Sequence, residues 1–420
     1  MSQRRPRVSF SLFFSLLLLL LSSGFCYLGI RLISSGTWQS SSSHVLWFLL
    51  TLPFASILWL PLVHWRSRSQ KMSKAHQAMI SLSYGSLAFL SFLLLAAFAR
   101  DILLFGASTV MFGVSHLSPI MGRGPATCQF SLGWLQGREA SLVLLSCAFL
   151  LYVWGRWECF RTPRVKRVEI PVAKLPAELE GYRLVQLSDV HVGPTIRGPF
   201  VARIVAKVNS LNPDVVALTG DIVDGRVADL RDEVEPFSKL SARDGKFFVT
   251  GNHEYYWGAE EWSEEMKRLG ISPLLNTHRL ICRGQARVCM AGVPDFWGEP
   301  PSETQSGESL PAADAKILLA HQPKSIFSAA QNGFDLQLSG HTHGGQFLPW
   351  TLFIRFFQPF VRGLNRYGSM WLYVSCGTGS WGPPVRLGAR SEITLLTLVN
   401  AERAPAPKTR KTLPLKPSFS

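Results

Sequence analysis

The stretch RLVQLSDVH, residues 183–191, joins a short apolar run to an aspartate and a histidine. The run RLVQLS has the length of a buried strand, and Asp189 and His191 follow it directly. In open α/β sheets, ligands bind at the carboxyl ends of the strands. The stretch therefore predicts a strand that presents a carboxylate and an imidazole to a binding site.

Further runs of the same kind follow along the chain. The clearest are DVVALT (214–219), KFFVT (246–250), KILLA (316–320) and DLQLS (335–339), with weaker candidates at RVCMAGV, WLYVS and EITLLTLV. Between the first two strands, residues 199–213 have apolar residues at helical spacing and end at Asn212-Pro213. A strand, a helix and a second strand predict a βαβ unit with a right-handed crossover. The domain is therefore expected to be α/β.

Each of the four later strands also ends in a residue that can bind a metal ion or move a proton. These residues are Asp221 and Asp224, then Asn252, His253 and Glu254, then His321, and finally His341 and His343. A lone histidine after a strand is usually an ordinary loop residue, but five strands in order with such endings indicate one converged site. Carboxylate, amide and imidazole groups without a thiolate are typical of a hard metal site.

The ordered set D-x-H, G-D-x-x-D, G-N-H-E, a lone His and G-H-T-H resembles the calcineurin-like metallophosphoesterase superfamily over about residues 180–400. The GHTHGGQ and RSEITLLTL stretches are similar to its membrane-anchored branch, with one departure at Ser391, where that branch usually has proline. The resemblance implies a two-sheet α/β/β/α sandwich, in which helices flank two packed sheets.

The resemblance also implies two divalent metal ions, with Mn, Fe, Zn and Mg all compatible. Their ligands would be Asp189, His191 and His343 at one ion, Asn252, His321 and His341 at the other, and Asp221 at both. His253 would be the catalytic general acid that protonates the leaving oxygen. Asp224 and Glu254 would orient ligands and loops around the metal ions.

The implied activity is hydrolysis of a phosphomonoester, a phosphodiester or a lipid-linked pyrophosphate by a hydroxide that bridges the two metal ions. One alternative is a non-catalytic, metal-loaded scaffold, but every motif position is filled, including His253. Another is a transporter-associated binding module. The clear apolar segments contain no ionisable residue within them, whereas transport pathways usually do, which favours an anchor.

The first 160 residues predict a transmembrane region. The whole chain is 47% hydrophobic and only 17% charged, and about 20 apolar residues suffice to cross ~30 Å of hydrocarbon. The expected spans are about 11–30, 45–63, 79–99 and 140–155, with 102–121 as a further candidate that His116 and Pro119 interrupt. The first span could instead be a signal peptide, but it lacks a clear cleavage site and further spans follow.

Basic clusters at the N-terminus, at 66–74 and at 156–167 set the expected orientation. Four spans place all three clusters in the cytoplasm, as the positive-inside rule requires, whereas a fifth span at 102–121 would place the last one on the far side. We therefore expect a multi-pass integral membrane protein whose catalytic domain, residues 168–400, is cytoplasmic. The tail, 401–420, is rich in Pro and Lys and predicts disorder. These clusters and the tail account for much of the net charge of +15, so no nucleic-acid partner is expected.

The segment FLPWTLFIRFFQPFVRG, residues 347–363, has two possible interpretations. It contains six aromatic residues and only two charges, Arg355 and Arg362, and Pro349 and Pro359 interrupt any long helix or central strand. One interpretation is a strand-and-loop element packed into the core. The other is a surface at the lipid interface, with arginines near anionic head groups, which would make membrane lipids partners and a lipid-linked phosphoester the substrate.

Overall fold

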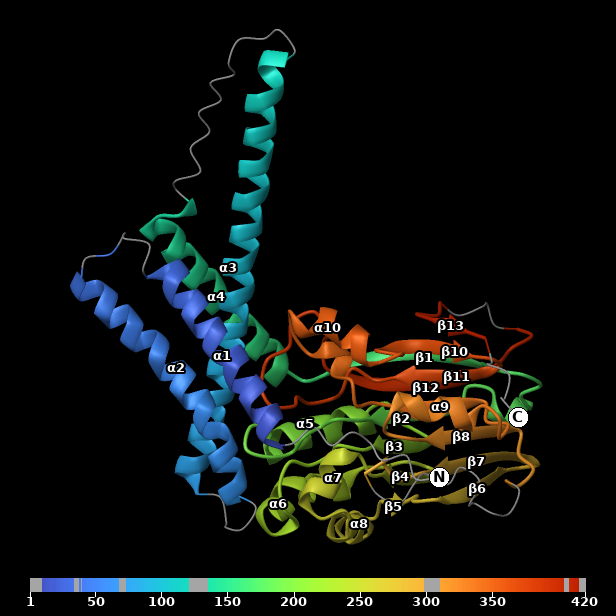
Figure 1. The fold of residues 1–420 in the computed structure, drawn as a ribbon. Coiled ribbons are helices and arrows are strands. Elements are labelled where there is room, and N and C mark those ends of the chain that lie inside the picture. The colour runs from blue at the N-terminus through green and yellow to red at the C-terminus, as the bar shows by residue number, and fades with distance from the viewer. Residues whose placement is uncertain are drawn as a thin grey trace. The chain divides into compact units, whose positions relative to one another are not determined.

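The computed structural model describes residues 10–33, 38, 40–67, 73–120, 135–297, 310–403 and 408–414. The chain divides into two compact units. The first contains residues 1–62 and 82–153, and the second contains residues 63–81 and 154–420. Figure 1 gives the course of the chain through both units by colour.

Four helices make up most of the described chain before residue 161. They are α1 (Phe10–Leu32), α2 (Ser40–Ser67), α3 (Lys74–Ile120) and α4 (Arg138–Phe160). Three stretches within α2, α3 and α4 are long and apolar enough to cross a membrane, namely Ser41–Pro61, Lys74–Val114 and Arg138–Phe160. A shorter apolar stretch, Leu18–Leu32, lies in α1. The four clear spans expected from the sequence therefore all fall in helices.

Helix α3 runs without a break through 47 residues and joins the expected span 79–99 to the doubtful stretch 102–121, of which residue 121 lies outside the described residues. At 1.5 Å per residue it is about 70 Å long, more than twice the thickness of the hydrocarbon layer. Between its two parts, Asp101 forms an ion pair of 2.8 Å with Arg31 and accepts a hydrogen bond from Tyr27. This polar cluster therefore interrupts an apolar stretch that continues to Val114.

The second unit contains two sheets. The strands of the first sheet, in spatial order, are β1 (Arg164–Val172), β12 (Glu392–Asn400), β2 (Arg183–Leu187), β3 (Val215–Thr219), β4 (Gly245–Val249) and β5 (Ser272–Pro273). Strands β2 and β3 are parallel and adjacent, with Leu184 opposite Val215, and α5 (Gly198–Asn209) connects them. The predicted βαβ unit is therefore confirmed.

The second sheet contains seven strands. In spatial order they are β13 (Thr412–Leu413), β10 (Gly363–Tyr367), β11 (Met370–Val374), β9 (Leu336–Ser339), β8 (Ala315–Leu319), β7 (Ala286–Gly292) and β6 (Thr277–Arg283). Strands β7, β8, β9 and β11 are parallel neighbours. All eight strands predicted from the sequence are present.

Apolar residues fill the space between the sheets and beneath the helices. Strand β2 illustrates the pattern, because Leu184 joins the cluster that both sheets share, whereas Val185 joins the cluster beneath α5, α6 (Val227–Val234) and α8 (Ala259–Arg268). Successive side chains of a strand point to opposite faces, so β2 is buried on both sides. On the far side of the second sheet, a third cluster includes Ile326 from α9 (Ile326–Ala329). The predicted α/β/β/α sandwich is confirmed.

Two ends of the domain differ from the sequence prediction. Strand β1 begins at Arg164, before the expected domain start at residue 168, and pairs in parallel with β12 along its whole length. Because its basic residues are typical of the flank of a membrane span, the sequence does not predict a strand here. In the tail expected to be disordered, residues 408–414 are described, and β13 pairs with β10. The other parts of that tail beyond residue 403, 404–407 and 415–420, lie outside the described residues.

Part of the aromatic segment 347–363 forms a surface helix, α10 (Trp350–Phe357), whose N-cap residue is Pro349. No residue of α10 is buried, and Phe356 and Phe357 are 83% and 73% exposed. The flanking Phe347 and Phe360, in contrast, are buried. The core interpretation is therefore correct for the two flanking phenylalanines and wrong for the helix between them.

Candidate metal centre

The carboxyl ends of five strands meet at one edge of the sandwich, and hydrogen bonds hold the two sheets together there. The side chain of Gln186, at the end of β2, donates to the Ser339 carbonyl of β9 at 2.9 Å and to the Thr219 hydroxyl of β3 at 2.8 Å. Ser188 donates to the Thr219 carbonyl at 3.1 Å. These bonds are fully buried, so they fix the strand ends that carry the predicted site residues.

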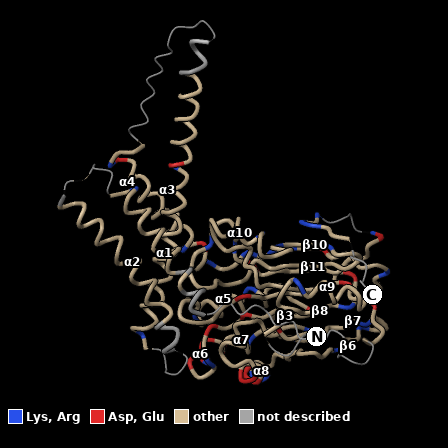
Figure 2. The backbone as a smooth tube through the Cα atoms, in the orientation of Figure 1, with Lys and Arg blue, Asp and Glu red and all other residues tan. Residues whose placement is uncertain are grey.

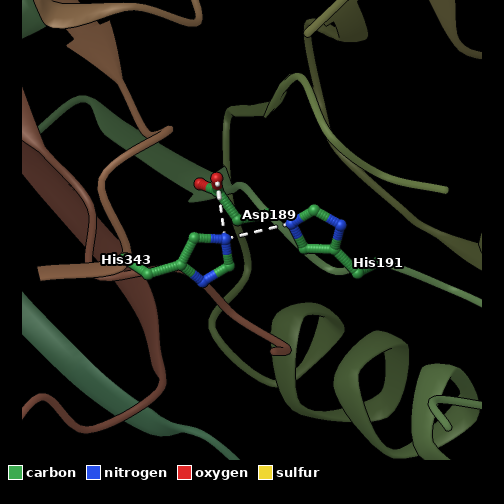
Figure 3. A group of neighbouring side chains, drawn as sticks. All are labelled: Asp189, His191 and His343. Atoms are coloured by element: carbon green, nitrogen blue, oxygen red, sulfur yellow. Dashed lines mark hydrogen bonds and ion pairs between the residues drawn. The ribbon is translucent and has the colours of Figure 1, made fainter. Parts of the chain in front are cut away.

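The first group of potential ligands consists of Asp189, His191 and His343 (Figure 3). One ligand atom from each lies within 4.8 Å of the other two, and all three residues are buried. The Nε2 atom of His343 is 3.4 Å from Oδ1 of Asp189 and 3.0 Å from Nε2 of His191. Residues that are 152 positions apart in the sequence thus point at one small volume.

The second group consists of Asp221, His321 and His341, again with ligand atoms within 4.8 Å. Nε2 of His321 is 3.1 Å from Oδ2 of Asp221, and Nδ1 of His341 is 3.0 Å from the side-chain oxygen of Asn252. The same Oδ2 atom of Asp221 is 3.9 Å from Nε2 of His191 in the first group. Asp221 therefore lies between the two groups.

The hydrogen bonds of the histidines fit bound cations. Nδ1 of His321 lies 2.8 Å from the Thr219 carbonyl, which can only accept, so Nδ1 carries the proton. Nε2 of His321 then faces the Asp221 carboxylate at 3.1 Å, where either a proton or a bound cation can lie between the two groups. Nδ1 of His191 is likewise bonded to Asp224 at 3.1 Å, and its Nε2 faces His343. Histidines that bind metal ions usually donate their other N–H group in this way.

The ionisable groups of the cluster shift the pKa values of one another. Burial raises the pKa of Asp189. Burial acts in the same direction on Asp221, but the surrounding histidines, with His321 the strongest, hold the pKa of Asp221 well below its usual range. Burial, together with the charge of His321, lowers the pKa of His341 to about 3, and burial is also the main reason why the pKa of His343 is low. Burial alone would lower the pKa of His321, but Asp221 and Asp189 raise it well above its usual range. His321 therefore holds a proton opposite Asp221, and a bound metal ion would have to displace that proton, because imidazole ligands bind metal ions in the neutral form.

The backbone around the cluster is strained. Five of the predicted ligands have positive φ angles, namely Asp189 (52°), His191 (54°), Asp221 (53°), His341 (71°) and His343 (51°). Such angles are uncommon outside glycine and are estimated to cost roughly 1–3 kcal/mol each. They are five of the nine non-glycine residues with positive φ in the described part of the chain. The strain is therefore concentrated where side chains have to converge.

Two glycines allow the close approach of these loops. A Cβ atom at Gly340 would collide with the Ser188 hydroxyl and the Asp189 carboxylate. At Gly220, which has a φ of 81°, a Cβ atom would lie 2.7 Å from Nδ1 of His321. The glycines of the G-D and G-H motifs therefore make room for the neighbouring ligands.

His253 lies beside both ligand groups, at the start of α7 (Asn252–Trp257). Its Nδ1 atom is bonded to Oδ1 of Asp224, and its Nε2 atom is 4.0 Å from Oδ2 of Asp221. The other oxygen of Asp224 is bonded to His191, so one carboxylate orients two rings. Burial alone would lower the pKa of His253, but Asp224 and Asp221 raise it to about 9.

Glu254 organises the loop that carries Asp221. Its buried carboxylate accepts hydrogen bonds from the backbone N–H groups of Asp221 at 2.9 Å, Ile222 at 2.8 Å and Gly251 at 2.6 Å. The strand ends of β3 and β4 are thus fixed to each other by one side chain. The structure brings Asp224 and Glu254 together with all the other predicted site residues.

Sequence reasoning missed Arg386, which is fully buried behind His343. Its guanidinium donates to the carbonyls of Cys376 at 2.6 Å, Gly379 at 3.0 Å and His343 at 3.2 Å, and lies 3.2 Å from Nδ1 of His343. Arg386 lies 43 residues beyond His343 in the chain, and no motif marks it. Only the folded loop brings the two together.

An aromatic rim beside His253 was also missed. The ring of Tyr256 is 5.0 Å from His253 and 5.6 Å from Trp297, and the ring of Trp381 is 6.1 Å from His253. Trp297 and Trp381 are 66% and 54% exposed. The three rings come from separate segments, so no sequence pattern could have grouped them.

Comparisons with known proteins place these features in a family context. Residues 182–345 match the family described as calcineurin-like phosphoesterase. Over 278 residues the chain is 40% identical to a Danio rerio protein named transmembrane protein with metallophosphoesterase domain, and the match covers 63% of each chain. The chain thus spans less than two thirds of that relative's length.

A second relative is a metallophosphoesterase of Campylobacter jejuni, described as uncharacterized. It is 35% identical over 266 residues, which cover 62% of this chain and 69% of the relative. Among solved structures, a 5'-nucleotidase precursor from Thermus thermophilus is 14% identical with a TM-score of 0.33, covering 51% of this chain and 54% of that one.

Proposed function

This chain belongs to the calcineurin-like phosphoesterase family, and we propose that it is a membrane-anchored hydrolase of phosphoric esters that uses two divalent metal ions. The observation that carries the proposal is the pair of ligand groups that meet at Asp221, in which every residue except His341 is buried. Each group combines carboxylate and imidazole atoms, and His253 lies beside both. A scaffold protein would have no need of a complete set of ligands with a proton donor next to it.

Seven residues would hold the two ions. Asp189, His191 and His343 would bind one, Asn252, His321 and His341 the other, and Asp221 both. Bound divalent ions supply positive charge that polarises the phosphoryl group and makes water more acidic. The mixture of oxygen and imidazole atoms is compatible with Mn, Fe, Zn or Mg.

The chain's own groups would manage the protons and the loops. In hydrolysis, the oxygen of a water molecule forms a new bond to phosphorus while the bond to the leaving oxygen breaks. Asp224 holds Nδ1 of His253, which leaves the Nε2–H group free to give its proton to the leaving oxygen. Glu254 keeps the Asp221 loop rigid during this exchange.

The membrane region supports four crossings by α1 to α4. The doubtful stretch 102–121 continues α3 instead of turning back, so it adds length and no further crossing. Four crossings leave all three basic clusters and the catalytic domain in the cytoplasm. A tag placed after Ser420 should be reached by antibody when only the plasma membrane is permeabilised. A tag that stays protected until internal membranes are opened would refute this topology.

Helix α10 supports a substrate in the membrane. It begins five residues after the short helix η5 (His343–Gly345), which carries a predicted ligand, and it exposes Trp350, Phe353, Phe356 and Phe357. An amphipathic aromatic helix is costly to leave in water and is typical of a lipid interface. We therefore propose membrane lipids as partners and a lipid-linked phosphoester as the substrate class.

A substrate screen on the full-length chain tests the proposed activity. The purified protein would be offered phosphomonoesters, phosphodiesters and lipid-linked pyrophosphates, after chelation and after return of Mn, Fe, Zn or Mg. We expect hydrolysis that disappears with the chelator and returns with at least one metal. A folded, metal-loaded chain that hydrolyses none of these substrates would favour the scaffold.

A further inference from the structure

A cavity that none of the predicted metal ligands lines lies within the second unit of the chain. It has a volume of about 1270 Å³ and is lined by the strands β1, β10 and β12, the loop 386–390 and residues 408–410. Arg386 is shared, because it borders the cavity and also contacts His343. The cavity is larger than a single small anion needs, and the proposed hydrolysis does not use it.

The cavity is strongly basic. Seven basic and three acidic side chains line it. One of the acidic side chains, Glu158, is already engaged by Arg161 at 3.1 Å and by Arg390 at 3.6 Å. Five of the basic residues have no carboxylate partner among the residues that the structure describes, and these are Lys166, Arg167, Arg362, Lys408 and Arg410. They come from three separate segments, so the charge is gathered by the fold.

Figure 2 shows the same asymmetry along the backbone, with acidic residues concentrated at α6 and α8 and basic residues beside β10. The unpartnered cations around one cavity repel one another, which is unfavourable unless an anion occupies the space. Lysine and arginine side chains are also the usual ligands for phosphate groups.

The cavity adjoins the two elements that we propose to meet the membrane. Trp154 and Glu158 line it, and both belong to the last two turns of the candidate span α4. On another side, Arg362 donates to the Gly388 carbonyl at 2.9 Å. A Cβ atom at Gly388 would lie 3.4 Å from the Thr351 side chain of α10, so the loop and the helix are neighbours. Trp154 is exposed, as tryptophans at a membrane interface commonly are.

We propose that this cavity binds the head group of an anionic membrane lipid that carries more than one phosphate. The basic charge requires a polyanion, and the end of α4 locates the cavity at the surface of the bilayer, where such head groups lie. The inference rests on the proposed anchoring by α4 and does not depend on hydrolysis at the metal centre.

The test uses the full-length chain in micelles of an uncharged detergent. Binding of short-chain phosphatidylinositol 4,5-bisphosphate would be measured by calorimetry, with short-chain phosphatidylcholine and the free inositol phosphate head group for comparison. The cavity variant combines Lys166→Gln, Lys408→Gln and Arg410→Gln. The control variant combines Lys207→Gln, Lys239→Gln and Arg279→Gln, which removes the same charge from exposed positions outside the cavity.

We expect the bisphosphorylated lipid to bind the wild-type chain more tightly than phosphatidylcholine or the free head group. The cavity variant should bind it at least about tenfold more weakly, since each basic residue near an anionic lipid contributes roughly fivefold. The control variant should change binding less than about twofold, because its cations are distant from the ligand. Equal weakening in both variants would overturn the proposal, since the effect would then be one of net charge.

Two further outcomes keep the inference separate from the proposed activity. A free head group that binds as tightly as the lipid would overturn the membrane source and favour a soluble polyphosphate. Hydrolysis of a small soluble phosphoester should be the same in the cavity variant and the wild type. If the wild type hydrolyses nothing but still binds the lipid through the cavity, the proposed activity fails while this inference stands.

Discussion

The metal cluster and helix α10 break the same packing rule in opposite directions. The cluster buries carboxylates and histidines that would normally face water, whereas α10 exposes large aromatic rings that would normally be buried. Each arrangement is unfavourable by itself and becomes reasonable once a partner is supplied. We propose a pair of cations as the partner of the cluster and lipid as the partner of α10.

The two regions differ in how strictly they specify that partner. In the cluster, five of the seven predicted ligands have positive φ angles and hydrogen bonds orient the rings of His191 and His321, so a single atom can matter. In helix α10, by contrast, several exposed aromatic rings share one apolar face, and each of them can make the same kind of contact. We therefore expect all-or-none effects in the cluster, and graded effects that depend on the substrate in α10.

Asp221→Asn should have the largest effect, because it removes a charge that both ligand groups share. Hydrolysis should fall by more than roughly 10⁴-fold, beyond the usual loss from removing an acid catalyst. The exposed Asp232→Asn on α6 provides a matched control that should leave the rate unchanged. A rate assay on the two proteins checks this, and an Asp221→Asn enzyme within tenfold of the wild type would contradict the shared role.

His253→Ala should lower the rate by about 10²–10⁴-fold while leaving the bound metal nearly intact, because the residue donates a proton and is not a proposed ligand. The half-buried His278 on the edge strand β6 provides a control, since His278→Ala removes an imidazole that belongs to neither ligand group. Metal analysis beside a rate assay separates the roles. Loss of metal from His253→Ala as large as that from Asp221→Asn would refute the assignment.

Arg386→Gln should have an intermediate effect, since the residue supports His343 without contacting substrate. The loss of groups that orient a metal ligand typically costs about 10–100-fold in metal affinity or activity. The conservative Arg386→Lys keeps the charge but cannot reproduce the planar set of bonds to three carbonyls. We therefore expect Arg386→Lys to restore only part of the metal affinity that Arg386→Gln loses. Metal titration at a temperature below the melting temperature of each variant measures this. Melting temperatures that fall with unchanged metal affinity would make Arg386 a purely structural residue.

The sequence predicted the site more completely than it predicted the boundaries of the fold. Each predicted ligand follows a recognisable strand, and parallel strands bring their carboxyl ends together, so convergence could be inferred without coordinates. Arg386 could not be found in this way, because its partners are backbone carbonyls that any sequence would supply. Strand β1 was missed because the same arginines and lysines can flank a membrane span or face solvent along an edge strand.

Helix α10 shows where composition stops being informative. Its aromatic residues fitted a core element and a lipid surface equally well, since both are apolar environments. Only the packing of Phe347 and Phe360, and the lack of any such packing for Phe356 and Phe357, separates the two. Periodicity describes the face of a helix, but what lies against that face is a tertiary property.

Phe356→Ser combined with Phe357→Ser should have the smallest effect on the chemistry itself. Because both rings are exposed, the free energy of unfolding should change by about 0.5 kcal/mol or less per residue. With the full chain in nanodiscs, turnover of a small soluble phosphoester should stay near normal, while turnover of a lipid-embedded substrate should fall. The exposed Leu280→Ser on β6 should alter neither rate. Equal loss on both substrates would show that α10 supports the fold and not the membrane contact.

The most direct test of the two-ion centre is the number of metal ions bound per chain. We expect two ions for the wild-type protein at saturating metal. We expect one ion for His343→Ala and one for His321→Ala, since each removes a ligand from a different group. A wild-type chain that saturates at one ion, or at none, would contradict the two-ion centre.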